Sequence, residues 1–229
     1  MKLRHEYKHE LSYVEMLSLR SRLKAVMQPD PHAIDGKYFI RSLYFDNVYD
    51  KALREKIDGV SNREKFRIRY YNRDISRIIL EKKSKIYGLC NKKQTVIDID
   101  TVKAICECNL KALEANKDPL VVELYQKMLT EGLRPKVIVD YDREPFVFSA
   151  GNVRVTLDYN IKTGLKNTDF LNTDAVTIPV VDSPIILEVK WDEYLPSIIK
   201  DVVQVPATHT AAFSKYAACR MYDYRMGNS

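Results

Sequence analysis

The sequence predicts an α+β fold built on an antiparallel sheet or barrel with helices at its periphery. Three observations lead to this prediction. Segments rich in β-branched and aromatic residues recur along the chain, and such residues favour strands. Short turn-like stretches separate many of these segments, as antiparallel neighbours allow. The helical patterns do not alternate regularly with the strands, which argues against a parallel sheet built from βαβ units.

The predicted strands cover most of the chain. Each combines Val, Ile, Tyr, Phe or Thr with alternating polarity, which is the pattern of a half-buried strand. Turn signals such as Asn72-Arg73-Asp74 separate neighbouring strands. In chain order, the predicted strands cover residues 3–11, 37–46, 64–72, 77–85, 93–99, 135–148, 153–159 and 184–191.

The predicted helices lie between these strands and near the end of the sequence. Ser12 and Glu15 have the spacing of a capping box, and apolar residues recur at helical spacing up to Met27. A helical pair is predicted over residues 100–115 and 119–131, and a last helix over residues 210–224. Residues 162–177 have no regular pattern, so we expect a long loop there.

The composition is that of a folded protein with a moderate positive charge. Apolar residues make up 45% of the chain, which excludes a disordered protein. The 37 Lys and Arg residues exceed the 31 Asp and Glu residues, giving a net charge of +6. We therefore expect an anionic partner such as a phosphate compound, nucleic acid or acidic lipid. Because the sequence has only seven glycines and no Gly-rich phosphate loop, phosphate chemistry would depend on side chains.

We expect a cytoplasmic protein without a membrane span of its own. No apolar run approaches the ~20 residues that a spanning helix needs, and the sequence opens without the apolar stretch of a signal peptide. The four cysteines are expected to be free thiols. Cys106 and Cys108 have no second cysteine pair that would complete a metal site.

The polar faces of the predicted strands carry long charged side chains. Residues two apart share one face of a strand. Arg67 and Arg69 therefore share a face, with Phe66 and Ile68 on the opposite face. Further faces of this kind hold Arg4, Glu6, Lys8 and Glu10; Glu81 and Lys83; Arg154, Thr156 and Asp158; and Glu188 and Lys190.

Two interpretations account for these charged faces. They could be solvated sheet surfaces with cross-strand ion pairs. Alternatively, the apolar faces pack against helices and the charged faces meet in a polar interior. Like charges confined in an interior repel strongly, so this arrangement requires a ligand. Arginine suits phosphate oxygens and carboxylates suit Mg²⁺ or Mn²⁺. We therefore favour an interior that binds a polyanion with a divalent metal.

The charged motifs together resemble the VTC domains, the polyphosphate polymerase family of the CYTH or triphosphate tunnel metalloenzyme superfamily. Glu6-x-Lys8 resembles the end of the superfamily's ExExK signature, whose first Glu is Arg4 here. That departure is similar to the VTC branch. The remaining blocks follow in the family's order over nearly the whole chain: residues 40–46 (IRSLYFD), 65–71 (KFRIRYY), 80–83 (LEKK), 141–144 (YDRE), 154–158 (RVTLD), 187–190 (LEVK) and 213–216 (FSKY).

This resemblance implies one domain over residues 1–229 that forms a closed eight-stranded antiparallel β-barrel, the triphosphate tunnel, with peripheral helices. The family's polymerases transfer the γ-phosphate of ATP to a growing polyphosphate chain inside the tunnel, with Mn²⁺ or Mg²⁺. The implied partners are ATP and inorganic triphosphate or polyphosphate. Nucleic acid is not expected, because carboxylates interleave with the cations. A membrane-protein partner is left open.

The resemblance also implies the site residues. The catalytic positions would be Arg67, Arg69, Lys83, Arg154, Glu188 and Lys190. The substrate-binding positions would be Lys8, Arg143, Ser214, Lys215 and Lys93, with Lys92 as the alternative to Lys93 because strand parity does not decide between them. The metal carboxylates would be Glu188, Glu6, Glu81 and Asp158; the last three could instead orient basic side chains.

Two arginines are harder to place. Arg143 shares its strand face with Val137, Val139 and Tyr141, which look like core residues, so its role depends on the resemblance alone. Arg41 has the opposite parity to Tyr44, which indicates a bulge or an outer role.

Two other functions remain open. A tripolyphosphatase or nucleoside triphosphatase would use the same tunnel, with water in place of the acceptor phosphate. A non-catalytic polyphosphate- or nucleic-acid-binding module is the second alternative. A nucleic-acid binder usually places aromatic side chains among its cations on an open surface, whereas carboxylates interleave with the cations here.

Overall fold

The computed structural model describes residues 4–86, 89–205 and 213–227. Leu3 of the first predicted strand and residues 210–212 of the last predicted helix lie outside this part of the chain. The protein forms two compact units. The first unit comprises Met1–Phe39, Tyr141–Ile161 and Val181–Phe213, and the second comprises Ile40–Asp140, Lys162–Val180 and Ser214–Ser229.

The first unit holds strands in the order β1-β10-β8-β7. These are β1 (His5–Leu11), β10 (Ile185–Trp191), β8 (Val153–Thr163) and β7 (Arg134–Phe148), of which β7 and β8 continue into the second unit. β10 pairs antiparallel with β1 and with β8, and β2 (Gln28–Pro29) pairs antiparallel with β7. The 3₁₀ turn η1 (Ala150–Asn152) joins β7 to β8.

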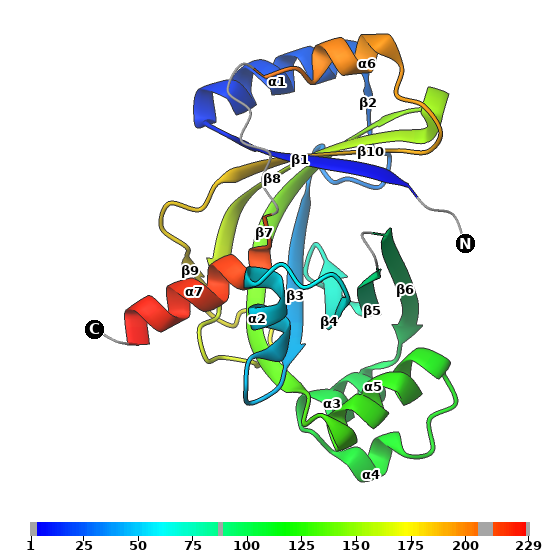
Figure 1. The fold of residues 1–229 in the computed structure, drawn as a ribbon, viewed down its shortest axis with the longest axis vertical. Helices are drawn as coiled ribbons and strands as arrows, with labels where there is room; N and C mark the ends of the chain where they lie inside the picture. The colour runs from blue at the N-terminus through cyan, green and yellow to red at the C-terminus, as the bar shows by residue number, and fades with distance from the viewer. Residues whose placement is uncertain (1–3, 87–88, 206–212, 228–229) are drawn as a thin grey trace. The chain divides into compact units, whose positions relative to one another are not determined.

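Two helices cover the apolar side of this sheet (Figure 1). α1 (Tyr13–Val26) and α6 (Ser197–Val202) lie in contact with each other. The predicted capping box is confirmed, because the Glu15 backbone N–H donates to Ser12 Oγ and the Ser12 N–H donates to Glu15 Oε2. The buried side chains of the unit come from both layers, as alternation in β8 and β10 requires: Leu19, Leu23, Val155, Leu157, Leu187, Val189 and Ile199.

The second unit holds strands in the order β7-β3-β4-β5-β6. β3 (Tyr38–Asp46), β4 (Arg63–Tyr71), β5 (Asp74–Ile86) and β6 (Leu89–Ile97) pair antiparallel in turn. The short strand β9 (Ile178–Pro179) pairs with the end of β8. β4 and β5 each alternate between a largely apolar face and a face rich in charge.

The helices of the second unit form two groups (Figure 1). α3 (Ile99–Cys106), α4 (Leu110–Leu113) and α5 (Pro119–Thr130) pack together beside β5, and α2 (Lys51–Ile57) packs against α7 (Lys215–Gly227). The helix predicted over residues 100–115 is two helices. Cys108 has a positive φ of 56°, a conformation that ends a helix, and Asn109 then caps α4.

The α+β class and the antiparallel sheet are confirmed, but the predicted closed barrel is wrong. A barrel requires its first and last strands to pair. The strand order runs linearly from β1 to β6, and no ladder joins these two strands within the described residues. The sheet is therefore open. That residues 1–229 act as one domain stays a prediction.

The predicted loop over residues 162–177 begins only after β8, at residue 164, and Arg41 anchors it. Its side chain is 3% exposed and donates to both carboxylate oxygens of Asp140, at 2.9 and 2.8 Å. It also donates to the backbone carbonyls of Asn172 and Ala175 at 2.8 and 2.9 Å. Arg41 therefore has a structural role, on the strand face opposite Tyr44.

In the part of the chain that the structure describes, no helix is both long and apolar enough to cross a membrane.

We predict that Arg41→Ala lowers the free energy of unfolding by about 3–5 kcal/mol, because it leaves the buried Asp140 carboxylate without its cation. Arg73→Ala is the matched control, since Arg73 and its partner Asp174 are 62% and 83% exposed, and such pairs contribute about 0–1 kcal/mol. Urea unfolding of both variants measures the difference. Equal losses would contradict the anchoring role.

Candidate functional site

Each unit carries a charged face on its part of the sheet. The first charged face consists of Glu6, Lys8, Arg143, Arg154, Asp158, Glu188 and Lys190, all in the first unit. Strand register brings most of these residues together. Glu6 lies opposite Lys190 and Lys8 opposite Glu188, and Lys190 lies in turn opposite Arg154. Directly opposite residues share a face, so these side chains form adjacent rows across β1, β10 and β8.

The carboxylates of Glu6 and Glu188 alternate with lysines. Lys8 Nζ lies 2.5 Å from Glu6 Oε1, and Lys190 Nζ contacts Glu188 and lies 3.8 Å from Glu6 Oε2. Burial disfavours the charged form of Lys8, but Glu188 and Glu6 raise its pKa. Burial and Glu188 act to raise the pKa of Glu6, but Lys8 and Lys190 lower it overall. Both groups are therefore held in their charged forms.

Arg143 belongs to the first charged face, although strand parity alone did not settle its position. Its Nε and Nη2 donate to the two oxygens of Asp158 at 2.6 and 2.7 Å, and Nη2 lies 3.7 Å from Glu188 Oε2. Its guanidinium lies over the Tyr141 ring, 5.6 Å from the centroid, so Tyr141 supports a cation at this position. Burial opposes the charge on Arg143, but fully buried Asp158 raises the Arg143 pKa well above its usual range.

Arg154 has a carboxylate partner that the sequence did not indicate. Its Nη2 donates to Asp30 Oδ2 at 3.1 Å. Asp30 lies directly after β2, between two prolines and outside every predicted element, so no strand alternation could have placed it. The Arg154 side chain is 39% exposed, which leaves its guanidinium accessible to a ligand.

The second charged face lies on β4, β5 and β6 of the second unit and consists of Lys65, Arg67, Arg69, Glu81, Lys83 and Lys92. Lys65, Lys83 and Lys92 form one row across the three strands, and Arg67 and Glu81 lie opposite each other in the next row. The second charged face therefore carries five cations and one carboxylate. Like charges that lie directly opposite each other destabilise a sheet.

Glu81 is the common partner of three of these cations. Arg67 Nε donates to Glu81 Oε2 at 2.5 Å, Lys92 Nζ lies 2.5 Å from Oε1, and Arg69 Nε lies 3.5 Å from Oε2. Glu81 is 1% exposed, and burial alone would raise its pKa. Arg67, Arg69 and Lys92 instead lower the pKa of Glu81 far below its usual range, so the carboxylate stays ionised.

Tyr44 is buried and also belongs to the second charged face. Its hydroxyl accepts from Arg67 Nη1 at 2.8 Å, and Lys65 and Arg67 lie over its ring at 5.5 and 5.6 Å. Burial acts to raise the pKa of Tyr44, but Arg67, Lys65 and Arg69 lower it to about 8. The Tyr44 ring also stacks on the ring of Tyr216 in α7, with the two ring centroids 5.2 Å apart.

The register of β5 and β6 corrects the choice of Lys93. Lys92 lies opposite Lys83 and contacts Glu81, whereas Lys93 lies opposite Lys82 on the other face, 3.6 Å from Glu123 of α5. Lys92 is therefore the residue that joins the charged face. Lys82 likewise contacts Glu64 and Glu123.

Two further predicted positions lie at the start of α7. Ser214 Oγ accepts from the Ala217 N–H at 3.4 Å and from Lys65 Nζ at 3.5 Å, so it links the helix to the lysine row. Lys215 is the first residue of α7 and is partly buried.

The donor chemistry indicates which carboxylates could hold a metal ion. No three His, Cys, Asp or Glu side chains among the described residues form a metal-binding group. Mg²⁺ and Mn²⁺ can instead bind to one or two carboxylates together with substrate phosphates. Glu188 and Glu6, which share Lys190, fit that requirement. Asp158 is engaged on both oxygens by Arg143, and Glu81 by three cations, so these two fit the orienting role better.

Comparisons with solved structures agree with this architecture. A Bacillus halodurans protein provisionally described as an adenylate cyclase has a TM-score of 0.51 and 13% identity, over 91% of this chain and 95% of its own. The Hippeastrum protein HpAC1, also a provisional adenylyl cyclase, has a TM-score of 0.53 and 13% identity, over 96% of both chains. At this identity the similarity concerns the fold. No curated protein sequence matches the chain.

The antiparallel sheet with its peripheral helices is the fold that the chain shares with these solved structures. The VTC domain family matches residues 3–222 of the sequence, so the chain belongs to the VTC domain family. The family assignment made from the ordered motifs is thereby confirmed. That both charged faces line one tunnel stays a prediction.

We predict that Glu81→Gln destabilises the protein at pH 7 by about 3–5 kcal/mol, because it leaves buried cations without their counter-charge. The folded pKa of Glu81 is lowered, so its contribution is complete above the unfolded value, near 4.3, and is lost as the pH falls further towards the folded pKa. The difference in unfolding free energy between the variant and the wild type should therefore shrink below about pH 4.3.

Urea unfolding at a series of pH values measures this difference. Glu107→Gln, at an exposed carboxylate after α3, is the control and should behave like the wild type. A pH-independent effect of Glu81→Gln would show that its charge is not what stabilises the face.

Proposed function

We propose that the protein is a metal-dependent polyphosphate polymerase that transfers the γ-phosphate of ATP to a growing polyphosphate chain. The second charged face carries this proposal, since five cations around one carboxylate suit a polyanion. Membership of the VTC domain family supports it, because the resemblance of the motifs implies this reaction.

The two charged faces suit different parts of the chemistry. Arg67 and Arg69 present planar guanidinium groups that can each contact two phosphate oxygens, and Lys65, Lys83 and Lys92 add point charges beside them. On the first charged face, Lys8, Lys190, Arg143 and Arg154 would hold phosphates. Glu188 and Glu6 would hold Mg²⁺ or Mn²⁺ there, and the bound ion would neutralise phosphate charge during transfer.

The reaction needs positioning more than a catalytic base. A terminal oxygen of the acceptor chain attacks the γ-phosphorus, the bond between the γ-phosphorus and the bridging oxygen breaks, and ADP leaves with the electron pair. The attacking oxygen is already ionised at neutral pH, so no side chain has to remove a proton from it. Fixed cations such as Arg67 and Arg69 would stabilise the charge that builds up on the transferred group.

A triphosphatase is the second candidate. The fold relative HpAC1 is described as having a dominant triphosphatase activity, and hydrolysis would use the same cations with water as the nucleophile. Incubation of the purified protein with ATP and Mn²⁺ distinguishes the two reactions. Long chains on a gel together with ADP support the polymerase. Free phosphate without chains would favour the hydrolase. If neither product forms, the remaining alternative is a non-catalytic binding module.

We predict that Arg67→Ala abolishes most of the rise in melting temperature that tripolyphosphate produces. The variant should still fold, because Glu81 keeps Arg69 and Lys92 as partners. Lys103→Ala is the control, since the Lys103 side chain is 55% exposed on α3 and forms an ion pair with exposed Asp100. Equal stabilisation of Arg67→Ala and the wild type by the ligand would exclude Arg67 from the site.

We also predict that Glu188→Gln loses metal-dependent turnover by a factor of at least about 10², as removal of one charge-stabilising group typically does. Affinity for tripolyphosphate without metal should be kept or increased, because a negative charge is removed from the first charged face. Steady-state turnover against Mn²⁺ concentration and calorimetric titration without metal measure the two effects. Unchanged metal dependence would contradict the role of Glu188.

A further inference from the structure

The first charged face contains a buried hydroxyl that no contact within the protein accounts for. Thr156 is 4% exposed, and its Oγ1 has no hydrogen-bond partner among the described residues. Its neighbours Val155 and Leu157 belong to the apolar core, so Thr156 lies on the charged side of β8. Most buried polar side-chain atoms have a partner, because an unpaired one costs free energy. The Thr156 hydroxyl therefore needs an explanation.

Packing does not supply this explanation. Valine has nearly the shape of threonine without the hydroxyl, and β8 has valine at position 155. Thr163, further along the same strand, shows how a structural threonine is satisfied. It is 0% exposed, and its Oγ1 donates to Asp223 Oδ1 at 2.9 Å and accepts from the Leu165 N–H at 3.0 Å. Thr156 has neither kind of contact among the described residues.

Strand register places the Thr156 hydroxyl beside the proposed metal carboxylate. Thr156 lies directly opposite Glu188, which lies in turn opposite Lys8. The Cβ atoms of directly opposite residues are about 4.5–5.5 Å apart, so the hydroxyl and the carboxylate can both contact one small ion. Arg154 and Asp158 lie two residues away on the same face of β8. The hydroxyl is thus surrounded by groups that this face offers to a ligand.

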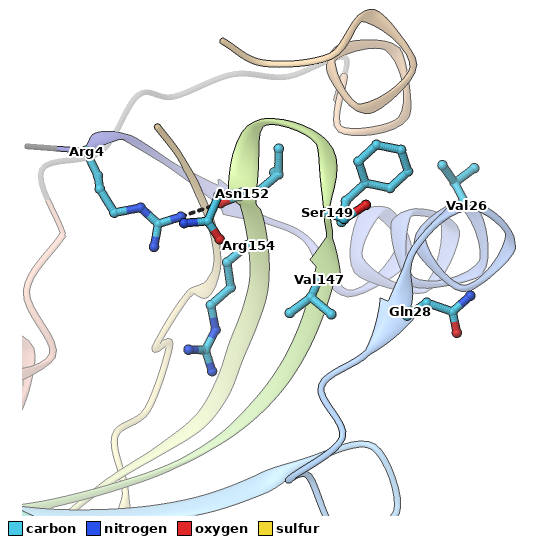
Figure 2. A pocket seen from close by; sticks show the side chains of 9 residues that line it. Arg4, Val26, Gln28, Val147, Ser149, Asn152 and Arg154 are labelled. Carbon is cyan, nitrogen blue, oxygen red and sulfur yellow. Dashed lines mark hydrogen bonds between the residues drawn. The ribbon is translucent and has the colours of Figure 1, made fainter. Parts of the chain in front are cut away.

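A ligand can approach this part of the face. Arg154 lines a pocket of about 520 Å³ together with Arg4 and Val147 (Figure 2). The whole lining of this pocket belongs to the first unit. Figure 2 shows the Arg154 side chain extending from β8 beside the pocket. The row next to Thr156 is therefore accessible, although the Thr156 hydroxyl itself is buried.

The donor set favours a metal ion as the partner of this hydroxyl. Phosphate oxygens already have four cations on the first charged face, whereas a metal ion has only Glu188 and Glu6 as free oxygen ligands there. Mg²⁺ prefers about six hard oxygen ligands, and phosphate-transfer proteins of another fold hold it with a Ser or Thr hydroxyl. Lys190, which contacts Glu188, would turn to the phosphates that accompany the ion.

We propose that the Thr156 hydroxyl is a third oxygen ligand, beside Glu188 and Glu6, for the divalent metal that accompanies a triphosphate on the first charged face. This inference rests on the proposed function, because it needs a face that binds phosphate together with Mg²⁺ or Mn²⁺. A neutral hydroxyl adds a ligand without adding negative charge, so the charge of the ion stays available to the phosphates.

Three variants test this inference. Thr156→Val removes the hydroxyl and keeps the shape of the side chain, and Thr156→Ser keeps the hydroxyl. Thr163→Val is the matched control, because Thr163 is buried on the same strand and its hydroxyl has partners. Calorimetric titration measures the affinity of each protein for tripolyphosphate with and without Mn²⁺, and a thermal melt without ligand measures stability.

We expect Mn²⁺ to increase the affinity of the wild type for tripolyphosphate. Thr156→Val should lose about tenfold in affinity with Mn²⁺, at the low end of what the loss of a group supporting a metal site costs, and nothing without Mn²⁺. Thr156→Ser should bind like the wild type. Without ligand, Thr156→Val should keep or raise the melting temperature, because it removes an unpaired buried hydroxyl, whereas Thr163→Val should lower it.

Unchanged metal-dependent binding by Thr156→Val would overturn the role of Thr156 while the proposed function stands. So would an equal loss of affinity with and without Mn²⁺, which would show that the hydroxyl contacts phosphate. A melting temperature of Thr156→Val lowered as far as that of Thr163→Val would show a structural hydroxyl and would also overturn the role. A wild type that does not bind tripolyphosphate, or binds it independently of Mn²⁺, would overturn both proposals.

Discussion

The second charged face depends on the ion pairs that the Glu81 carboxylate forms with its neighbouring cations. Glu81 is almost completely buried on β5, and it contacts Arg67 and Arg69 of β4 and Lys92 of β6. Without an ionised carboxylate at this position, β4, β5 and β6 would hold only repelling cations in their central rows. One carboxylate holds the cations in place but leaves a positive excess. That excess explains why a polyanion is the ligand that completes the face.

The two faces differ in charge balance, because the positive excess is small on the first and large on the second. The first charged face has four cations and three carboxylates, in alternating rows, whereas the central part of the second has five cations and one carboxylate. Near-balance suits a metal ion together with phosphates, because Glu188 and Glu6 offer hard oxygen ligands among lysines.

Much of this could be predicted from alternation, because strand parity alone places Arg67 with Arg69 and Glu188 with Lys190. Other features depend on contacts between strands that sequence does not encode locally. The choice of Lys92 over Lys93 depends on the register of β5 and β6. The position of Arg143 depends on Asp158, fifteen residues away on another strand. The sheet is open because its first and last strands do not pair within the described residues, and no local pattern specifies whether they do.

A crystal structure with a non-hydrolysable triphosphate analogue and Mn²⁺ tests the central claim most directly, namely that the charged faces are ligand-binding surfaces. The account predicts phosphate oxygens within hydrogen-bonding distance of the Arg67 and Arg69 guanidinium groups, and Mn²⁺ coordinated by Glu188. A triphosphate that binds elsewhere, with the ion pairs of Glu81 and Glu188 left as they are in the free protein, would show that these faces are structural ion-pair networks.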